Sequence, residues 1–455
     1  MAIATINPAT GETERVFDAH TAGDIDAALA QAEAAFAVTR RAAVSERTGW
    51  LRGAAEILRT EKNALAAILT TEMGKTLKSA VAEVEKCAWV CDFYAENAEA
   101  YLADRAIPTE AARSFVRYLP IGPVLAVMPW NFPLWQVFRF AAPAIAAGNV
   151  GVLKHASNVP QSALAMEDIW LRAGAPKGAF QTLLIGGGAV EGVLTDPRIR
   201  AATLTGSEGA GRAVGETAGR ELKKVVLELG GADAFIVTPS ADLDLAVEKA
   251  VQSRTLNNGQ SCISAKRFIV HADVYDAFRD AFAAKLGALK VGDPMADDTE
   301  IGPLATEAIR AELAQQVEDS VAAGAARVVG AEMIDGPGWF YRPGLLDAIP
   351  ESAPAYAEEL FGPVASLFKA GSFDEAIAIA NATPFGLSSA IFTNDEAEIE
   401  RAFNELDAGG TFVNAFTASD PRLPFGGVKA SGHGRELAAE GMREFLNVKT
   451  CVVAG

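Results

Sequence analysis

The chain has 455 residues, more than one typical domain of about 100 to 200 residues needs, so two or three packed units are expected. Half of the residues are hydrophobic and 22% are charged, which is typical of a globular enzyme and not of a disordered or fibrous protein. The 40 basic and 58 acidic side chains give a net charge of −18, which disfavours nucleic acid and anionic membrane as partners.

The first hundred residues are predicted to be helical because apolar residues recur at helical spacing, and the segments are 25–38, 47–58 and 64–102. The N-terminus lacks the cationic start and apolar core of a secretory signal. The longest uncharged apolar stretch, residues 140–153, contains a proline and is too short to span a bilayer. These features predict a cytoplasmic protein.

The chain has four cysteines, too few for a disulfide framework in a chain of this length. Cys87 and Cys91 lie four residues apart in the last predicted helix, but no histidine or further cysteine accompanies them. Buried packing is therefore predicted in preference to a metal pair, and the sequence predicts no metal site.

From Val124 onward, short apolar runs rich in β-branched residues alternate with helical segments, as in VLAVM, VGVLK, AATLT and KVVLEL. This alternation builds a parallel sheet that helices cover on both faces. It resumes after Gly231, which predicts a second α/β unit with helices at 243–254 and 274–289 and strands at 262–270, 365–368 and 388–392. The runs SFVRYL (114–119) and NVKTCVVAG at the C-terminus fit neither unit and are expected to be strands that find a partner.

Cys262 stands in NNGQSC, a polar turn with a glycine that would present its thiol at the start of a strand. A cysteine without further context is most often buried and inert, and the alternative is a nucleophile. Upstream, Glu228 interrupts an apolar strand just before a glycine pair that would let the backbone turn. A charge in such a strand is costly unless it is paired or used, so Glu228 is either a buried ion-pair member or a general base for water.

None of the four histidines lies in a pattern that suggests a Cys–His dyad, so a carboxylate is the better candidate base. Asn131, in PWNFP, follows a strand and precedes a helix. Its amide could hold an oxyanion, although an asparagine at a helix start is more often an N-cap. TGSEGAG (205–211) is a strand-to-helix turn that suits a pyrophosphate, but its glycine spacing is loose.

Taken together, PWNFP, LKHAS, LTGSEGAGRAVG, LELGG, NNGQSC, EELFGP and LPFGGVKASGHGRE resemble the aldehyde dehydrogenase superfamily in order and spacing over nearly the whole chain. LKHASNVPQSA and the compact length are most similar to the bacterial succinate-semialdehyde dehydrogenase group. The resemblance implies two Rossmann-like open-sheet α/β domains plus a small β oligomerisation arm, and a homodimer or dimer of dimers. The implied divisions are a dinucleotide-binding domain (1–112 and 124–229), a catalytic domain (230–420), an arm (113–123 and 440–455) and a return to the cofactor-domain side (421–439).

The resemblance also assigns roles to residues of the site. The family's cysteine, here Cys262, attacks the aldehyde, and the side-chain amide of Asn131 with the Cys262 N–H holds the oxyanion. Hydride passes to the nicotinamide, and water activated by Glu228 hydrolyses the resulting thioester. The implied cofactor residues are Lys154 at the adenosine ribose, Ser207 at the pyrophosphate, Glu359 at the nicotinamide ribose, and Trp130, Glu208, Leu229 and Phe361 around the same cleft.

One departure from the family pattern bears on the cofactor. Where many NAD-using relatives have Lys-Pro-Ser-Glu, this chain has Lys154-His155-Ala156-Ser157. A carboxylate there would repel the 2′-phosphate of NADP, whereas Ser157 can donate a hydrogen bond and leaves Lys154 as a counter-ion. The sequence therefore predicts that NADP is preferred, with NAD possible.

Arg139 lies in an otherwise apolar stretch and matches the arginine that binds the distal carboxylate in succinate-semialdehyde dehydrogenases; the alternative is a structural ion pair. Leu256 stands where some members carry a second arginine. The predicted function is oxidation of succinic semialdehyde to succinate with NADP, and another semialdehyde, an aliphatic aldehyde or a non-catalytic role remain as alternatives. Four further substrate-binding candidates are Trp135, Ser261, Ser419 and Phe425.

Overall fold

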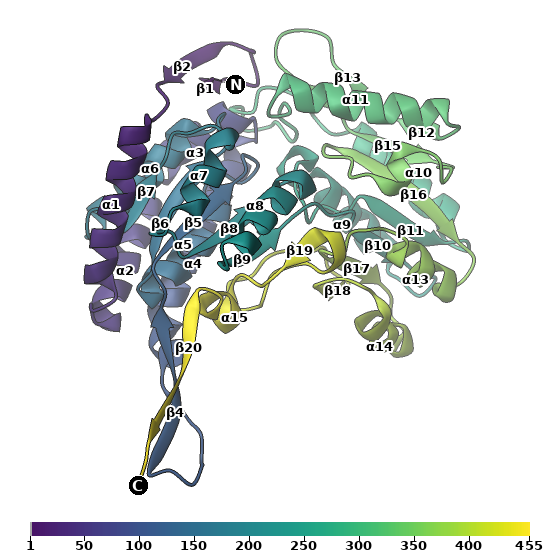
Figure 1. Ribbon diagram of the computed structural model, residues 1–455. Coiled ribbons are helices and arrows are strands. Elements are labelled where there is room, and N and C mark those ends of the chain that lie inside the picture. The colour runs from purple at the N-terminus through teal and green to yellow at the C-terminus, as the bar shows by residue number, and fades with distance from the viewer. Residues whose placement is uncertain (1) are drawn as a thin grey trace.

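The computed structural model describes residues 2–455. Two open sheets with helices on both faces form the body of the molecule, and a narrow antiparallel sheet projects from it, with the C-terminus at its tip (Figure 1). The predicted α/β class with a small β arm is confirmed.

The first sheet has six strands in the order β19-β9-β8-β5-β6-β7, parallel except for β19. Its central strands are almost fully apolar because helices cover both faces. Helices α2 to α6 pack on one face and α1, α7 and α8 on the other. The strand bounds are β5 Pro123–Met128, β6 Val150–His155, β7 Phe180–Thr182, β8 Ala201–Thr205, β9 Lys224–Glu228 and β19 Gly432–His433. The helices are α1 Ala22–Thr39, α2 Val44–Thr60, α3 Lys62–Met73, α4 Leu77–Leu102, α5 Trp135–Ala147, α6 Pro160–Arg172, α7 Val190–Thr195, α8 Glu208–Arg220 and α15 Ala438–Arg443.

The second sheet has seven strands in the order β12-β15-β16-β11-β10-β17-β18, and only β12 runs antiparallel to its neighbour. Helices α9 and α10 cover one face, and α13 and α14 cover the other. The strand bounds are β10 Ala234–Val237, β11 Arg267–His271, β12 Ala326–Val329, β15 Gly344–Asp347, β16 Val364–Ala370, β17 Ser389–Phe392 and β18 Thr411–Val413. The helices are α9 Leu243–Thr255, α10 Tyr275–Gly287, α11 Glu307–Ala322, α12 Pro354–Ala357, α13 Phe373–Asn381 and α14 Glu396–Glu405.

The projecting arm joins the two segments that fitted neither unit. Strand β4 (Arg113–Pro120) pairs with β20 (Leu446–Val453) in antiparallel register along its whole length, and β3 (Arg105–Ala106) adds a short edge. The expectation that both segments are strands with a partner is confirmed.

Three expectations about local structure were wrong. The predicted helix 64–102 is two helices, because Gly74 ends α3 at φ +83° and Thr76 caps α4. Residues 262–266 form a turn, and the predicted strand begins only at Arg267. The first twenty residues contain a hairpin, β1 (Ile3–Ile6) with β2 (Thr13–Phe17), and another short pair is formed by β13 (Glu332–Met333) and β14 (Tyr341–Arg342).

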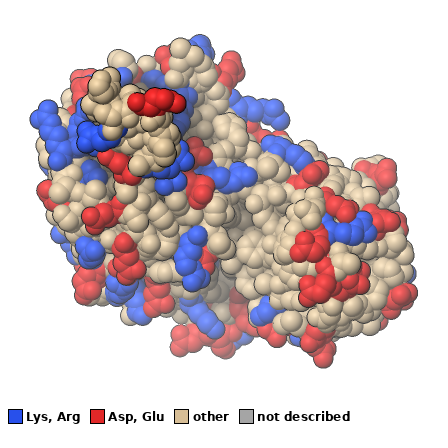
Figure 2. All heavy atoms as spheres, turned by 90° about the horizontal axis from the view of Figure 1, so that it is seen from below, with Lys and Arg blue, Asp and Glu red and all other residues tan. Residues whose placement is uncertain are grey.

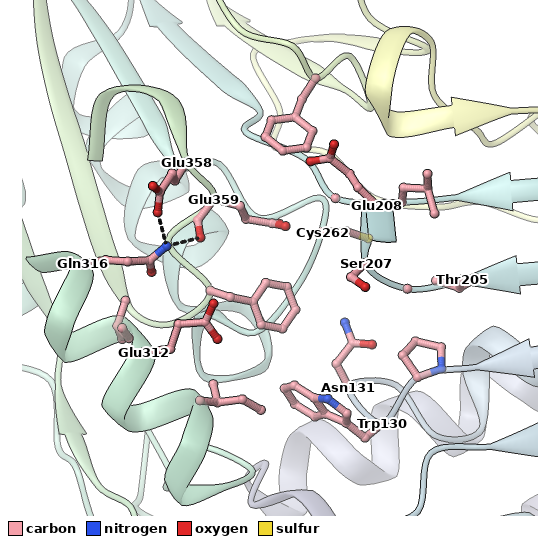
Figure 3. Close-up of a pocket in the computed structure, with 18 of the residues that line it drawn as sticks. Trp130, Asn131, Thr205, Ser207, Glu208, Cys262, Glu312, Gln316, Glu358 and Glu359 are labelled. Atoms are coloured by element: carbon pink, nitrogen blue, oxygen red, sulfur yellow. Dashed lines mark hydrogen bonds between the residues drawn. The ribbon is translucent and has the colours of Figure 1, made fainter. Parts of the chain in front are cut away.

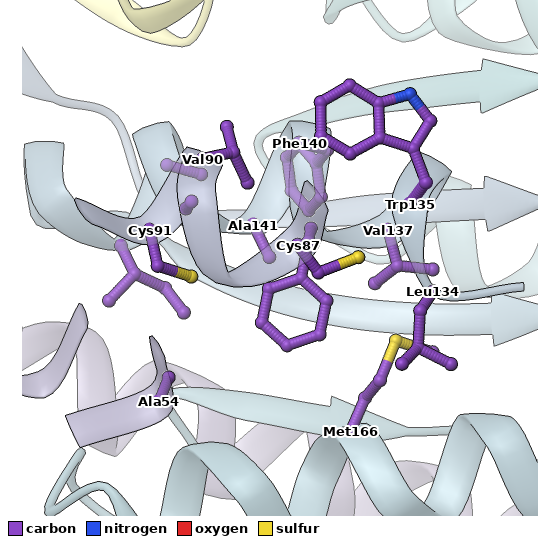
Figure 4. Close-up of a cluster of buried hydrophobic side chains, with 14 of the residues drawn as sticks. Ala54, Cys87, Val90, Cys91, Leu134, Trp135, Val137, Phe140, Ala141 and Met166 are labelled. Carbon is purple, nitrogen blue, oxygen red and sulfur yellow. The ribbon is translucent and has the colours of Figure 1, made fainter. Parts of the chain in front are cut away.

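The packing of α4 against α5 forms much of the first core. Cys87 and Cys91 are both fully buried there among apolar side chains of α2, α5 and α6, so the prediction of buried packing is confirmed (Figure 4). Burial raises the pKa of both thiols well above the usual value, as expected for inert core cysteines. The start of α5, which follows Asn131, therefore rests on a rigid support.

On the face shown in Figure 2, basic and acidic side chains are interspersed over much of the surface. Many of the exposed charges form ion pairs, such as Arg117 with Asp104 and Arg401 with Asp374. Within residues 2–455, no helix is long and apolar enough to cross a membrane.

Candidate active site

The candidate site lies at the carboxyl ends of the first sheet's parallel strands, where ligands bind in open α/β folds. Asn131 follows β5, Lys154 lies near the end of β6, Ser207 follows β8 and Glu228 ends β9. Residues from the second unit close the other side around a cavity of about 510 Å³. Figure 3 shows Cys262, Asn131, Trp130, Ser207 and Glu359 around this cavity.

The segment before Cys262 is held by two asparagines in the left-handed conformation, at φ 58° and 57°. Asparagine adopts this conformation more readily than most residues. The side-chain amide of Asn257 donates to the Asn131 carbonyl at 2.7 Å, and that of Asn258 donates to the carbonyls of Gly74 and Pro303. The NNGQ segment thus fixes the cysteine turn against the helical layer and the Asn131 segment, a role that its polarity alone did not reveal.

Two buried basic side chains, Lys266 and Arg254, stabilise the turn that contains Cys262. The Lys266 ammonium donates to the carbonyls of Ser261 at 2.7 Å and Cys262 at 2.6 Å, while the Arg254 guanidinium donates to the carbonyls of Gly259 and Ala265. These bonds satisfy backbone carbonyls of the segment before β11, since buried carbonyls require a hydrogen-bond partner.

The glycine pair after Glu228, Gly230 and Gly231, leaves room for neighbouring residues of the site. Neither Gly230 nor Gly231 has a positive φ, so the expectation that they permit a sharp turn was wrong. A Cβ at Gly231 would lie 2.7 Å from the Cys262 carbonyl oxygen, and one at Gly230 would lie 2.8 Å from a Glu359 carboxylate oxygen. The chain after β9 can therefore pass directly against the Cys262 carbonyl because Gly231 lacks a side chain, and Gly230 leaves room for the Glu359 carboxylate.

Cys262 lines the cavity together with Asn131. Burial raises the pKa of the Cys262 thiol to about 12, and the charges of Lys266 and Arg139 act in the opposite direction. The thiol is therefore neutral at rest near neutral pH, and it needs a base before it can act as a nucleophile.

Glu228 is 2% exposed, and neither carboxylate oxygen has a hydrogen-bond partner within residues 2–455. Burial raises its pKa well above the usual value; Arg139 opposes this shift and Glu436 adds to it. No ion pair to Glu228 forms within the described chain, so the ion-pair alternative does not account for this carboxylate. A buried, unpartnered carboxylate with a raised pKa has the properties of a general base.

Asn131 does not act as an N-cap, because Leu134 takes that position in α5. The N–H groups of Leu134 and Trp135 instead donate to the Glu83 carboxylate at 2.8 and 2.9 Å, and Glu83 also forms a buried ion pair with Lys75. The Asn131 amide donates to the Gln260 carbonyl at 3.1 Å and faces the cavity.

His155 supports the same segment from the sheet side. Its Nδ1 accepts from the Ala156 N–H, so its Nε2 donates to the Pro133 carbonyl at 2.8 Å. Burial lowers the pKa of His155 to about 4, which keeps the ring neutral. The histidine in LKHAS is thus a structural support for the Asn131 segment.

The side wall of the cavity carries six of the eight predicted cofactor residues. Ser207 caps the N-terminus of α8, where its hydroxyl accepts a hydrogen bond from the Ala210 N–H. Glu359 forms an ion pair with Lys266 at 2.8 Å, and the rings of Trp130 and Phe361 meet edge to face at 5.8 Å. This combination of a helix N-terminus, a carboxylate and an aromatic wall fits a dinucleotide. The six residues are Trp130, Ser207, Glu208, Leu229, Glu359 and Phe361.

Lys154 and Ser157 are not part of the cavity lining and lie at the adjacent end of β6. Burial lowers the pKa of Lys154. The Ser157 carbonyl accepts a hydrogen bond from the Ala4 N–H, so the N-terminal hairpin of β1 and β2 packs against the end of β6. Within residues 2–455, no group of three or more metal-ligating side chains is present.

The five predicted substrate-binding residues do not line this cavity. Arg139 is buried in an ion pair with Glu436, which is the structural alternative that the sequence left open, and its guanidinium lies 4.6 Å above the Phe425 ring. The ion pair that the sequence left as the alternative is therefore present, and binding of a substrate carboxylate by Arg139 stays a prediction. Trp135 and Phe425 belong to the apolar cluster against which Cys262 packs. Ser261 is fully buried, and Ser419 is 7% exposed.

Lys86 is a residue of this region that the sequence analysis missed. It extends from α4 to the Ser419 hydroxyl, at 2.8 Å, and over the Trp135 ring. A lysine on an amphipathic helix gives no signal by itself, because most such lysines are solvated.

A thiol and an amide donor that line a cavity, together with a buried carboxylate that has no hydrogen-bond partner, have the composition of the site of a cysteine-dependent dehydrogenase. Residues 1–451 match the Aldehyde dehydrogenase family, and the chain belongs to that family. It is 57% identical to succinate-semialdehyde dehydrogenase (NADP+) 1 of Mycobacterium tuberculosis strain ATCC 25618 / H37Rv, over an alignment covering 100% of both chains.

Among solved structures, the chain is similar to succinic semialdehyde dehydrogenase from Streptococcus pyogenes in complex with NADP+, with a TM-score of 0.97, 37% identity and coverage of 99% of this chain and 100% of that one. It is also similar to a lactaldehyde dehydrogenase, with a TM-score of 0.97, 30% identity and coverage of 100% and 96%.

Proposed function

We propose that this aldehyde dehydrogenase oxidises succinic semialdehyde to succinate with reduction of NADP. The observation that carries the proposal is that Cys262 and Asn131 line one cavity, while the buried, unpartnered Glu228 lies three residues before Gly231, which packs against the Cys262 carbonyl. The names of the relatives at 57% and 37% identity support the choice of substrate and cofactor.

The first step is attack on the aldehyde. Glu228 takes the thiol proton of Cys262, and the thiolate sulfur bonds to the carbonyl carbon. The charge that develops on the carbonyl oxygen is stabilised by the Asn131 amide and the Cys262 backbone N–H. NADP held against Ser207, Glu359 and Phe361 would supply the acceptor for the hydride of the aldehyde carbon, and the acyl group would then remain on Cys262 as a thioester.

The second step is hydrolysis of the thioester. Glu228 first releases the thiol proton to solvent, and it then removes a proton from water while the water oxygen attacks the thioester carbon. The C–S bond then breaks, the sulfur is protonated and the carboxylic acid leaves. A base with a raised pKa suits this step, because a base acts best when its pKa lies near the working pH.

The charge of Glu436 makes the pH dependence testable. Glu436 raises the Glu228 pKa, and it also pairs with Arg139, whose charge lowers that pKa. Glu436→Gln removes the first effect and strengthens the second, so the Glu228 pKa falls. The acid limb of the kcat profile, where Glu228 becomes protonated, should therefore move to lower pH. Glu440→Gln, at an exposed position of α15, is the control and should leave the profile unchanged. An acid limb that does not move in Glu436→Gln, or that moves to higher pH, contradicts the assignment of Glu228 as the base.

The cofactor preference is assigned to the residues that end β6. Lys154 supplies a positive charge for a 2′-phosphate, and Ser157 a hydrogen-bond donor without a negative charge. Ser157→Glu should lower kcat/KM for NADP by roughly 10- to 100-fold, as like charges a few ångströms apart repel by a few kcal/mol. The measurement is steady-state kinetics with both cofactors, with Ser45→Glu as a matched remote control. An NAD preference in the wild type, or an unchanged ratio in the variant, argues against this assignment.

A substrate panel tests the proposed function. NADP reduction is measured with C3 to C6 aldehydes and semialdehydes, including glutaric semialdehyde and the neutral butanal. The highest kcat/KM is expected for succinic semialdehyde. A higher value for another aldehyde would replace the substrate, and no turnover with any aldehyde would favour a non-catalytic role.

We also infer that the arm of β4 and β20 pairs copies of the chain into a homodimer or dimer of dimers. The support is that β20, which runs along the whole arm, exposes three valines: Val448, Val452 and Val453 are 56%, 60% and 47% exposed. Exposed apolar strand residues of this kind ordinarily find a partner.

A further inference from the structure

Lys266 contacts the peptide group that joins Ser261 to Cys262. In the proposed reaction, negative charge develops on the carbonyl oxygen of the aldehyde beside the Cys262 N–H. The carbonyl at the other end of the same peptide group accepts a hydrogen bond from the Lys266 ammonium at 2.7 Å. Lys266 is therefore placed to change the strength of this N–H as a donor. Such a role rests on the proposed function, because that function places an oxyanion at the Cys262 N–H.

The position of Lys266 is fixed by strands of the second sheet. Its side chain is 2% exposed and does not line the cavity, whereas Cys262 does (Figure 3). The Lys266 N–H donates to the Asp233 carbonyl, just before β10, at 3.1 Å, and the Lys266 carbonyl accepts from the Ser366 N–H of β16 at 2.9 Å. The ammonium thus reaches the cysteine turn from a backbone that is held on both sides.

The hydrogen bonds of the turn also determine where its N–H groups point. The carbonyls of Ser261 and Cys262 both accept from the Lys266 ammonium, at 2.7 and 2.6 Å. The carbonyl and the N–H of a trans peptide point in opposite directions, and the chain has no cis peptide bond among residues 2–455, so the Cys262 N–H points away from Lys266. Within the same residues this N–H donates to no backbone carbonyl, which leaves it available to an oxyanion.

The second proposed oxyanion donor lies next to the first. The Asn131 amide donates to the Gln260 carbonyl at 3.1 Å, and Gln260 is two residues before Cys262. An amide nitrogen carries two protons, so one remains for the bound oxygen. The inward carbonyls and the outward donors therefore belong to one short segment of chain.

A positive charge at a carbonyl oxygen strengthens the N–H of the same peptide group. The ammonium draws electron density toward the oxygen, and hydrogen bonds in a chain polarise one another in this way. The interaction is stronger where water is excluded, and Lys266 is buried. Glu359, which lines the cavity, lies 2.8 Å from the ammonium and offsets only part of its charge at the peptide.

We propose that Lys266 is a positioning residue that directs the Cys262 N–H toward the reacting carbonyl and strengthens it as an oxyanion donor. The ammonium acts through the Ser261–Cys262 peptide and does not touch the substrate. Ionisation of the thiol is a separate effect, because the Lys266 charge also opposes the burial that raises the pKa of Cys262. The test must therefore be independent of the fraction of thiolate.

Two electrophiles separate the oxyanion from the thiolate. With p-nitrophenyl acetate, the sulfur of Cys262 bonds to the carbonyl carbon, an oxyanion forms, p-nitrophenolate leaves and an acetyl thioester remains. With iodoacetamide, the sulfur bonds to a saturated carbon, iodide leaves and no oxyanion forms. The thiol proton passes to Glu228 in both reactions. Both consume the same thiolate, so the ratio of their rates cancels a change in the thiol pKa, and neither requires aldehyde or NADP.

Lys266→Met should lower the ratio of the acylation rate to the alkylation rate by about 5- to 50-fold, since complete loss of an oxyanion donor costs about 100- to 1,000-fold and this donor is only weakened. The rates are those of p-nitrophenolate release in the first turnover and of Cys262 alkylation by mass spectrometry. Lys285→Met, at an exposed position of α10, is the control and should leave the ratio unchanged. All proteins carry Cys451→Ala, which removes the thiol of the arm.

A second comparison covers damage to the fold, because Lys266→Met leaves the Glu359 carboxylate without its ion pair. Lys266→Met/Glu359→Gln removes both charges and is compared with Glu359→Gln, so that the two proteins differ only in the ammonium. The same fall in the ratio is expected. Equal slowing of acylation and alkylation in this comparison would show that Lys266 acts only on the thiol or on the fold, and it would overturn the proposal.

The outcome is separate from that of the aldehyde panel. A lower ratio without Lys266 supports its role at the oxyanion even if another aldehyde replaces succinic semialdehyde. An unchanged ratio overturns that role even if the panel confirms the substrate.

Discussion

Replacing Cys262 by alanine is expected to lower aldehyde-dependent NADP reduction by at least about 1,000-fold, because covalent catalysis loses its nucleophile. Asn131 and the cofactor cleft remain in the variant, but they can only bind and polarise the aldehyde. No other cysteine can replace the thiol, since Cys87 and Cys91 are fully buried in the first core and Cys451 lies on the arm.

The measurement is the rate of NADPH formation at saturating aldehyde and NADP. Cys451→Ala is the matched control, because it removes a thiol from an element outside the cavity and should retain wild-type activity. The thermal unfolding midpoint establishes that Cys262→Ala folds. A folded variant that keeps more than about one tenth of the wild-type rate would exclude Cys262 as the nucleophile.

Replacing Glu228 by glutamine is expected to lower steady-state turnover by roughly 100- to 10,000-fold, the usual effect of losing a general base. Glutamine has nearly the same shape but cannot accept the proton from water. At high pH, where the Cys262 thiol ionises without help, the first turnover should still occur and the thioester should accumulate. The expected time course is a burst of NADPH followed by a very slow phase.

Rapid mixing followed by NADPH absorbance measures this burst. Its amplitude should approach one equivalent per active site, whereas Glu216→Gln, at an exposed position of α8, should behave as the wild type does. A Glu228→Gln protein that turns over at the wild-type rate would exclude the base role. Equal slowing of the first and later turnovers would show that Glu228 acts only before the thioester forms.

The sequence predicts the fold class well because the two α/β units depend on local patterns. Buried parallel strands are continuous apolar runs, and β5 and β8 both fall within predicted runs. The break between α3 and α4 was missed because Gly74 lies in an otherwise continuous helical pattern. The turn at 262–266 was missed because the hydrogen bonds that stabilise it come from the side chains of Lys266 and Arg254. The direction of these side chains depends on the folded structure, so the local sequence does not report it.

The chemistry of the site was less accessible from the sequence. Cys262, Glu228 and Asn131 were identifiable through motifs, but their roles stay predictions until they are tested. The pairing of Arg139 with Glu436 joins residues on α5 and near the C-terminus, so no local pattern reports it. Lys86 was missed for the same reason, because only its contacts with Trp135 and Ser419 distinguish it from a solvated lysine.

The central claim is that oxidation proceeds through a thioester on Cys262 which Glu228 resolves. Mass spectrometry of Glu228→Gln, reacted with succinic semialdehyde at high pH and quenched in acid after the NADPH burst, tests this claim most directly. The account predicts one succinyl group per chain, located on the peptide that contains Cys262 and absent when NADP is omitted. An NADPH burst with an unmodified Cys262, or with the acyl group on another residue, would contradict it.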